Sequence, residues 1–208
     1  MGLRQYKAAR LKLDFLEQAV KLIGHKPFQD LHVADICRRV KVSKVTFFNY
    51  FKSKEELLMY WHRVWCFQRT AELHAKPKHG VAGLAYLSDK LSEEAEAHPG
   101  LIYSLIGYLN DLKRPVKPFP VKGEEKTELF PKHQELAALE IKSLDQMVEG
   151  FVLEAIQRKE ITKSSSTREL TNLILAVLYG SLMVANLNKQ APANTVRRAL
   201  DMAIKSLK

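Results

Sequence analysis

The sequence predicts an all-α protein of about nine helices. Apolar residues recur three and four positions apart along almost the whole chain of 208 residues, which is the spacing of helices with one buried face. No alternating apolar and polar run of useful length indicates a strand. With 46% apolar and 27% charged residues, the chain has the composition of a globular protein that can form a core.

The N-terminal quarter predicts three helices and the start of a fourth. An apolar stripe over residues 8–23 stops at Gly24, a residue type at which helices commonly end. A second helix is expected over residues 31–40, and Ser43 opens a third short helix. Ser53 and Glu56 have the spacing of a capping box, so a fourth, long helix should begin at about residue 54.

The remaining chain predicts five more helices. Proline and glycine separate helices over residues 81–97 and 101–112, and four prolines with several charges make residues 113–131 a loop. Helices are then expected over residues 132–159, 167–188 and 194–207. The natural domain boundary falls at the start of the fourth helix, which gives domains of residues 1–53 and 54–208.

Residues 171–188 carry no charge over 18 positions, which is the short limit for a membrane span. Gly180 and Ser181 interrupt the apolar centre, and asparagines flank it. A helix buried against two partners is therefore preferred, with a membrane span as the alternative. The N-terminus lacks the apolar segment of a signal peptide, so we expect a cytoplasmic protein without a membrane partner.

The charge distribution favours a polyanionic partner. The net charge is +10, of which residues 1–60 carry +6, so the basic density lies at the front of the chain. Two cysteines are too few for a disulfide scaffold. Glu94 and His98 share a helix face, but no second pair accompanies them, so we expect no metal. No catalytic constellation or glycine-rich phosphate loop is present, which predicts neither an enzyme nor a cofactor.

The strongest motif is the segment VADICRRVKVSKVTFFNYFKSKEELL, residues 33–58. Its apolar residues fall where two short helices joined by a tight turn need packing. The segment closely resembles the DNA-binding domain of the tetracycline-repressor (TetR-like) family of bacterial transcription regulators. The resemblance covers roughly residues 10–60 and implies an N-terminal three-helix helix-turn-helix domain. It also implies a C-terminal helical domain for effector binding and homodimerisation, and a double-stranded, pseudo-palindromic DNA operator.

The resemblance assigns eight residues to DNA binding: Ser43, Lys44, Val45, Thr46, Phe48, Asn49, Tyr50 and Lys54. Of these, Asn49 can pair with adenine, Lys44 can bind guanine or phosphate, and Val45 and Thr46 can touch a thymine methyl group.

Other side chains of this segment should support the helices. Ser43 should cap the recognition helix, while Tyr50 and Lys54 resemble phosphate contacts. Phe47 and Phe51 are one turn apart and should form core.

The segment also departs from the family pattern. His32 stands where a capping Ser or Thr is usual, and Lys41 replaces the common turn glycine at a cost of about 1 kcal/mol. Taken singly, Lys12, Lys52 and Lys54 read as solvated surface lysines, and only the motif raises Lys54 above that expectation.

The C-terminal half gives weaker signals. Most of its aromatic and Met side chains suit a core, but a minority could line a pocket for a small apolar or aromatic effector: Trp65, Tyr103, Met147 and Phe151. Two apolar helices predict a two-fold interface at Leu178, Gly180, Ser181, Val184, Val196 and Leu200.

Three functions therefore stand open. The first is a dimeric transcriptional regulator, most simply a repressor released from its operator by the effector. The second is a helical small-molecule-binding protein whose DNA-binding function has decayed, and the third is an enzyme that uses the pocket. The lack of a catalytic constellation argues against the third.

Overall fold

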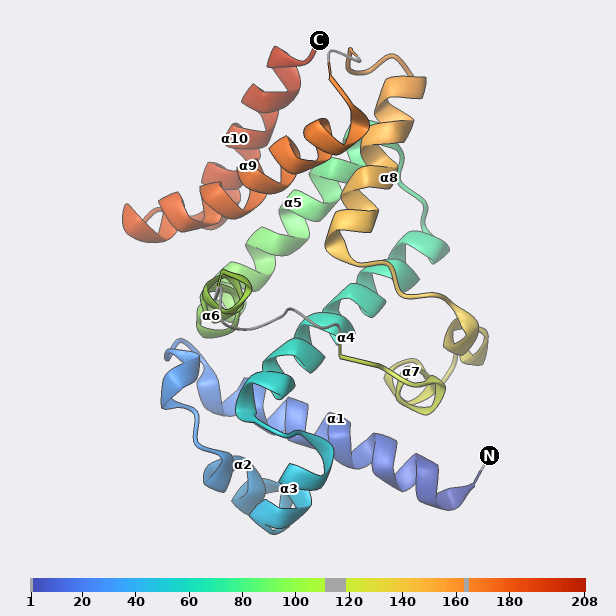
Figure 1. Cartoon of the computed structure of the whole chain (residues 1–208), viewed down its shortest axis with the longest axis vertical. Helices are drawn as coiled ribbons and strands as arrows, with labels where there is room; N and C mark the ends of the chain where they lie inside the picture. Colours follow the sequence, from blue (N-terminus) through green and yellow to red (C-terminus); the bar gives the residue numbers. More distant parts are fainter. Residues whose placement is uncertain (1, 111–118, 163–164) are drawn as a thin grey trace. The chain divides into compact units, whose positions relative to one another are not determined.

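A computed structural model of the chain describes residues 2–110, 119–162 and 165–208. These residues form ten α-helices and two short 3-10 helices, without a strand (Figure 1). The α-helices are α1 (Leu3–Ile23), α2 (Val33–Val40), α3 (Lys44–Tyr50), α4 (Lys54–Ala75), α5 (Gly80–Ala97), α6 (Pro99–Leu109), α7 (Gly123–Leu129), α8 (Leu144–Gln157), α9 (Thr167–Leu187) and α10 (Pro192–Ser206). The 3-10 helices are η1 (Phe28–Asp30) and η2 (Gln134–Ala138). The predicted all-α class is confirmed.

The chain divides into two compact units. The first comprises Met1–Glu72 with His98–Ile141, and the second comprises Leu73–Ala97 with Lys142–Lys208. The N-terminal helices therefore share a unit with α6 and α7, which are distant in sequence. The functional division at residue 53 stays a prediction.

Two expectations for the middle of the chain were wrong. The expected loop over residues 113–131 contains α7, and residues 111–118 lie outside the described residues. A carboxylate oxygen of Glu125 accepts the backbone N–H of Lys122 at 2.9 Å and so caps this helix. The expected helix over residues 132–159 begins only at Leu144, because Ser143 and Gln146 form a capping box there.

An aromatic cluster forms the core beneath the N-terminal helices. Phe15, Phe47, Phe51 and Tyr60 are all fully buried. The ring of Phe47 lies 5.2 Å from that of Phe15, and the ring of Phe51 lies 5.5 Å from that of Tyr60. Edge-to-face and tilted aromatic pairs at these distances stabilise a core beyond the burial of area alone. The cluster therefore fastens α3 to both α1 and α4.

A buried ion pair joins α7 to α1. Lys12 was expected at the surface, but its side chain is buried and its Nζ atom donates to Glu125. The Nζ atom also lies 4.4 Å from the ring centre of Tyr60 and 5.0 Å from that of Phe119. Burial lowers the pKa of Lys12, while Glu125 acts in the opposite direction. The expectation failed because the partner of Lys12 lies more than a hundred residues along the chain.

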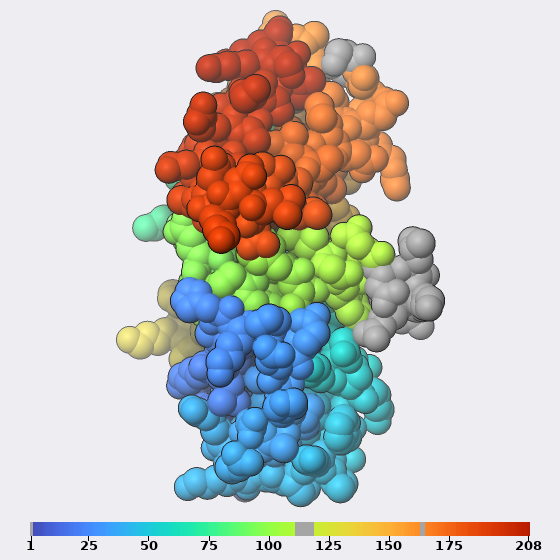
Figure 2. Space-filling model, turned by 90° about the vertical axis from the view of Figure 1, so that its left-hand side faces the viewer, coloured from blue at the N-terminus to red at the C-terminus, as the bar shows by residue number. Residues whose placement is uncertain are grey.

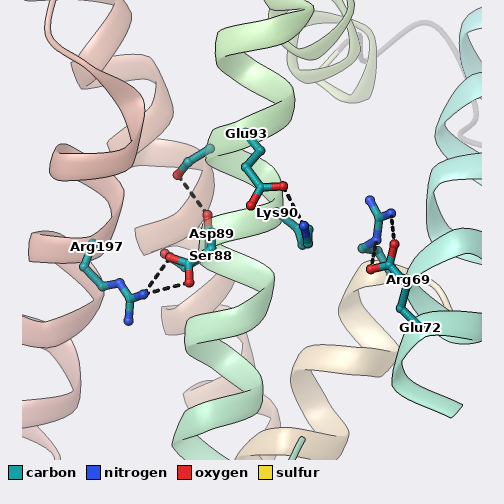
Figure 3. Close-up of polar contacts among 8 residues, drawn as sticks. Arg69, Glu72, Ser88, Asp89, Lys90, Glu93 and Arg197 are labelled. Atoms are coloured by element: carbon teal, nitrogen blue, oxygen red, sulfur yellow. Dashed lines mark hydrogen bonds and ion pairs between the residues drawn. The ribbon is translucent and has the colours of Figure 1, made fainter. Parts of the chain in front are cut away.

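The second unit consists of α5, α8, α9 and α10. Helix α10 packs on both α9 and α5, and α8 packs on α5 and α9. Gly83 lets the two helices α5 and α8 approach closely, since a Cβ atom there would lie 2.2 Å from the Phe151 ring. Arg197 of α10 donates to both carboxylate oxygens of Asp89 on α5, at 2.7 and 2.8 Å (Figure 3). These contacts fix the four helices as one body.

Helix α9 is long and apolar enough to cross a bilayer, with a mean hydropathy of 1.7. The core helix of a soluble protein meets the same criterion. In this unit Leu170, Ile174, Leu178 and Leu182 are buried against the neighbouring helices. The preferred interpretation, a helix buried within the protein, accounts for this face of α9.

The buried ion pair generates a stability prediction. Lys12→Met should lower the free energy of unfolding by about 3–5 kcal/mol, because it leaves the Glu125 carboxylate buried without its counter-ion. The double variant Lys12→Met/Glu125→Gln should recover most of this loss, because glutamine still caps α7 but carries no charge. Urea unfolding followed by tryptophan fluorescence measures both, since Trp61 and Trp65 lie in this unit. Equal destabilisation of the single and double variants would contradict the electrostatic explanation.

Candidate nucleic-acid interface

Helices α2 and α3 are joined by a tight turn whose strain falls on one residue. Lys41 adopts a left-handed conformation with φ of 61° and ψ of 44°, where glycine is the favoured residue. The backbone N–H of Val42 then donates to the carbonyl of Cys37 at 3.0 Å, which closes the turn. The expected strained turn at Lys41 is confirmed, as is the absence of a side-chain cap at His32.

Ser43 caps α3 as predicted. Its Oγ atom accepts the backbone N–H of Thr46 at 3.1 Å and lies 2.9 Å from the Thr46 hydroxyl. Such a cap typically contributes about 1 kcal/mol to helix stability. The Thr46 side chain is half-buried and engaged with Ser43, so it is less available to a partner than the sequence suggested.

The two faces of α3 differ sharply. Phe47 and the following Phe51 are fully buried, as predicted. The opposite face is exposed and carries Lys44, Val45, Phe48 and Asn49, and α2 and α3 lie at the surface of their unit (light blue in Figure 2). Tyr50 is half-buried, with its ring 6.1 Å from that of Phe15. The structure thus presents four of the eight side chains predicted for DNA binding together on one exposed face of α3.

Lys54 has a different role from the predicted phosphate contact. Its Nζ atom donates to the carbonyl oxygens of Phe28, Gln29 and Leu31, at 3.2, 2.8 and 3.2 Å. All three N–H donors of the ammonium are therefore used to hold η1 and the start of the α2 segment. In this structure the three hydrogen bonds of Lys54 stabilise the helix-turn-helix. A contact between Lys54 and a phosphate would require those bonds to break.

Further exposed basic side chains, not predicted to bind DNA, lie on the helix-turn-helix segment. Arg38, Arg39, Lys41 and Lys52 are all exposed on the helix-turn-helix segment. Arg38 pairs with Asp35 at 3.0 Å, while the other three add positive charge beside α3. In the sequence, only the basic excess of residues 1–60 pointed to these side chains. A count of charges does not show which side chains point outward, so the individual residues could not be named.

The four predicted effector residues are divided between the units. Trp65 and Tyr103 belong to the first unit, and Met147 and Phe151 belong to the second. Trp65 is buried, stacks with Arg69 at 5.2 Å, and has an indole N–H without a hydrogen-bond partner among the described residues. Arg69 is itself held by a bidentate pair with Glu72 (Figure 3). Their role in ligand binding stays a prediction.

The predicted dimer residues need a correction. Leu178, Ser181, Val196 and Leu200 are buried inside their own unit, so they cannot be the primary contacts with a second copy. These residues lie on the inner side of α9 and α10, which a helical pattern that is apolar on several sides could not reveal. The outer side of α9 carries a different stripe at helical spacing: Leu173, Ala176, Val177, Gly180, Val184 and Leu187.

No group of three or more His, Cys, Asp or Glu side chains that could hold a metal occurs among the described residues. Cys37 and Cys66 are both buried and form no disulfide among the described residues, and burial raises the pKa of Cys37. Cys37 therefore has the small-core role expected for it.

The contacts of Lys54 generate a second prediction. Lys54→Met should lower the free energy of unfolding of the DNA-free protein by about 2–3 kcal/mol, because three carbonyls lose a charged donor. Thermal unfolding without DNA measures this, and Lys52→Met on the same exposed segment serves as the matched control. A Lys54→Met protein as stable as the wild type but weaker on DNA would restore the phosphate role.

Comparison with known proteins identifies the N-terminal segment. Residues 15–60 match the family profile "Bacterial regulatory proteins, tetR family". These residues contain α2, the turn, α3 and the start of α4. No curated protein matches the chain.

Solved structures of similar fold span the whole chain. FadR of Bacillus subtilis, solved with stearoyl-CoA, has a TM-score of 0.62 at 19% identity and covers 94% of this chain and 99% of its own. A TetR regulator from Haloarcula marismortui gives 0.63 at 14% identity, covering 95% and 98%. A third, from Chloroflexus aurantiacus, gives 0.60 at 18% identity, covering 98% and 96%. Residues 15–60 thus carry the helix-turn-helix of the tetR family profile, and the chain shares its overall fold with solved TetR regulators.

Proposed function

We propose that the protein is a homodimeric repressor that binds a pseudo-palindromic operator through α3 and is released by a small apolar or aromatic ligand. The observation that carries the proposal is the exposed face of α3, where Lys44, Val45, Phe48 and Asn49 project from a helix fastened by buried Phe47. An exposed helix of this kind fits the major groove, where side chains reach the base edges.

The surrounding residues suit the DNA backbone. Ser43 and Tyr50 flank the exposed face of α3, and Lys41 and Lys52 add positive charge close by in the chain. Lysines that neutralise phosphates supply sequence-independent affinity, while groups on the base edges supply specificity. The surface therefore contains both kinds of contact that a specific DNA-binding protein needs.

The alternative is a ligand-binding protein with a decayed DNA-binding domain. In a decayed domain we would expect lost caps and polar substitutions at the packing positions. Ser43 still caps α3, and the aromatic core beneath it is intact. These features favour retained DNA binding.

The homodimer is supported by the outer face of α9. Leu173, Val184 and Leu187 are large apolar side chains left exposed on that face, and Met202 is exposed on the adjoining α10. Helices α9 and α10 pack together and both reach the surface (orange and red in Figure 2). Contiguous exposed apolar surface in a soluble protein commonly marks an interface. A two-fold pairing of this face would bury it.

The effector class rests on the sequence and on one similar fold. Three of the residues predicted for effector binding are buried apolar side chains, Trp65 in the first unit and Met147 and Phe151 in the second. FadR of B. subtilis was solved with stearoyl-CoA, a ligand with a long apolar chain, which supports an apolar effector here. As a DNA-binding regulator, the protein should act in the cytoplasm without a membrane partner.

The DNA-binding proposal predicts a selectable operator. Purified protein should enrich, from a random pool, a pseudo-palindrome with half-site centres about 34–36 Å apart or a multiple of that spacing. Asn49→Ala should lose about 1–3 kcal/mol of discrimination at one position in each half-site, because alanine cannot form paired hydrogen bonds with a base. Fluorescence anisotropy at physiological salt measures both.

Asn172→Ala is the matched control for this experiment, since Asn172 is exposed on α9 and lies outside the recognition surface. It should leave affinity and sequence preference unchanged. Equal affinity of the wild-type protein for selected and random DNA would rule out the proposed function.

The proposed dimer surface predicts that some substitutions prevent dimerisation without unfolding the protein. Val184→Glu and Leu187→Glu should give folded monomers, because a carboxylate in a closed apolar interface would be desolvated. Leu178→Glu should instead unfold the second unit, since Leu178 is fully buried there. Leu153→Glu, at an exposed leucine on α8 outside the stripe, should stay dimeric. Light scattering and circular dichroism test this, and a wild-type monomer at micromolar concentration would contradict it.

A further inference from the structure

We infer that α3 reads thymine methyl groups through Val45 and Phe48, so that each operator half-site contains two nearby thymines facing these side chains. The inference rests on the proposed DNA-binding function and adds the base type that the protein recognises. It gives Phe48 a role in base specificity and places the second thymine contact at Phe48 instead of Thr46.

Among the described residues of the first unit, few large apolar side chains are exposed, and they are not evenly distributed. In the described part of the first unit, the exposed large apolar side chains are Leu3, Val45 and Phe48. Two of the three therefore lie on one face of a seven-residue helix. Val45 is 70% exposed and Phe48 is 43% exposed, although Phe47 of the same helix is fully buried. Exposed apolar groups that cluster in this way indicate a surface that meets another molecule.

Val45 and Phe48 are both held in place before DNA binds. The Phe48 ring lies 5.4 Å from the buried Phe47 ring, edge-on at 88°. Phe47 is in turn fixed by contacts with Phe15 and Phe51. Val45 is β-branched, so its side chain has few rotamers in a helix. Little conformational entropy remains to be lost when these groups contact a base.

Thr46 is less suited than Val45 and Phe48 to contact a thymine methyl group. Its hydroxyl lies 2.9 Å from the Ser43 hydroxyl and its backbone N–H donates to the same atom. The Thr46 side chain is half-buried and its hydroxyl is directed to Ser43, so it offers the groove less apolar surface than Val45 or Phe48. Phe48, one turn beyond Lys44, is the remaining apolar group that points outward with Val45.

The chemistry of the major groove then selects the base. Thymine alone among the four bases presents a methyl group there, while guanine and cytosine present polar groups that need partners. A guanine or cytosine against Val45 or Phe48 would leave such groups desolvated and unpaired. Along the helix axis three residues rise about 4.5 Å, close to the 3.4 Å spacing of bases. Val45 and Phe48 should therefore meet neighbouring base pairs, with the adjacent Asn49 available for adenine.

The test removes one methyl group at a time. Once an operator has been selected, each thymine is replaced by deoxyuridine, which keeps every hydrogen-bonding group and lacks only the methyl. At two positions in each half-site the wild-type protein should lose about fourfold in affinity, as expected for uncovering one methyl-sized group. Other thymine positions should be unaffected.

Two alanine variants assign the positions. Phe48→Ala should bind thymine and deoxyuridine equally at one of the two positions while keeping the loss at the other, and Val45→Ala should show the opposite pattern. Val45→Ala should leave the melting temperature of the free protein nearly unchanged, because Val45 is largely exposed. Phe48→Ala should lower it slightly through the lost contact with Phe47, and circular dichroism should show that both variants are folded. Where cytosine in place of a contacted thymine weakens binding, 5-methylcytosine should recover part of the affinity.

The outcomes separate this inference from the proposed function. If a specific operator is found and the affinity is unchanged by loss of the methyl group at every thymine position, the inferred recognition of thymine methyl groups is wrong. The proposed DNA binding would then still hold. If the wild type and both variants respond equally to deoxyuridine, the effect belongs to the DNA itself and the inference also fails. If no sequence is preferred at all, the proposed function fails first.

Discussion

The exposed face of α3 depends on the burial of Phe47 and Phe51 against Phe15 and Tyr60. Helix α3 has only seven residues, and a helix so short is not stable in water on its own. Its conformation is therefore maintained by the apolar contacts of one face, with the Ser43 cap at its start. Because that face is fixed in the core, the opposite face is directed outward with Val45 and Asn49 exposed.

The same cluster extends to a segment distant in sequence. Phe119 lies 5.3 Å from Phe51, and Glu125 both caps α7 and neutralises buried Lys12. A buried lysine is tolerated only with such a partner. The residues after position 118 are thus part of the support of the recognition helix, which explains why the first unit is larger than the helix-turn-helix. Any rearrangement of α7 must alter the surroundings of Phe51.

Local features of the fold were predictable, and long-range partners were not. The turn at Lys41 and the cap at Ser43 depend on residues within five positions of each other, so the sequence shows them directly. The positions of Lys12 and Lys54 depend on Glu125 and on the carbonyls around η1, which no periodicity connects to them. A lysine in a helical pattern looks solvated unless its distant partner is known.

Helix α9 shows the same limit for apolar residues. Leu178 and Val184 are alike in the sequence, yet one is fully buried in its unit and the other is 45% exposed. Hydrophobic periodicity identifies apolar faces but cannot say which neighbour covers each face. The exposed apolar side chains of α3 and α9 therefore carry information that the buried ones do not. Their exposure costs free energy in the isolated chain, and a partner that covers them would recover it. The partners we propose are thymine methyl groups for α3 and a second copy for α9.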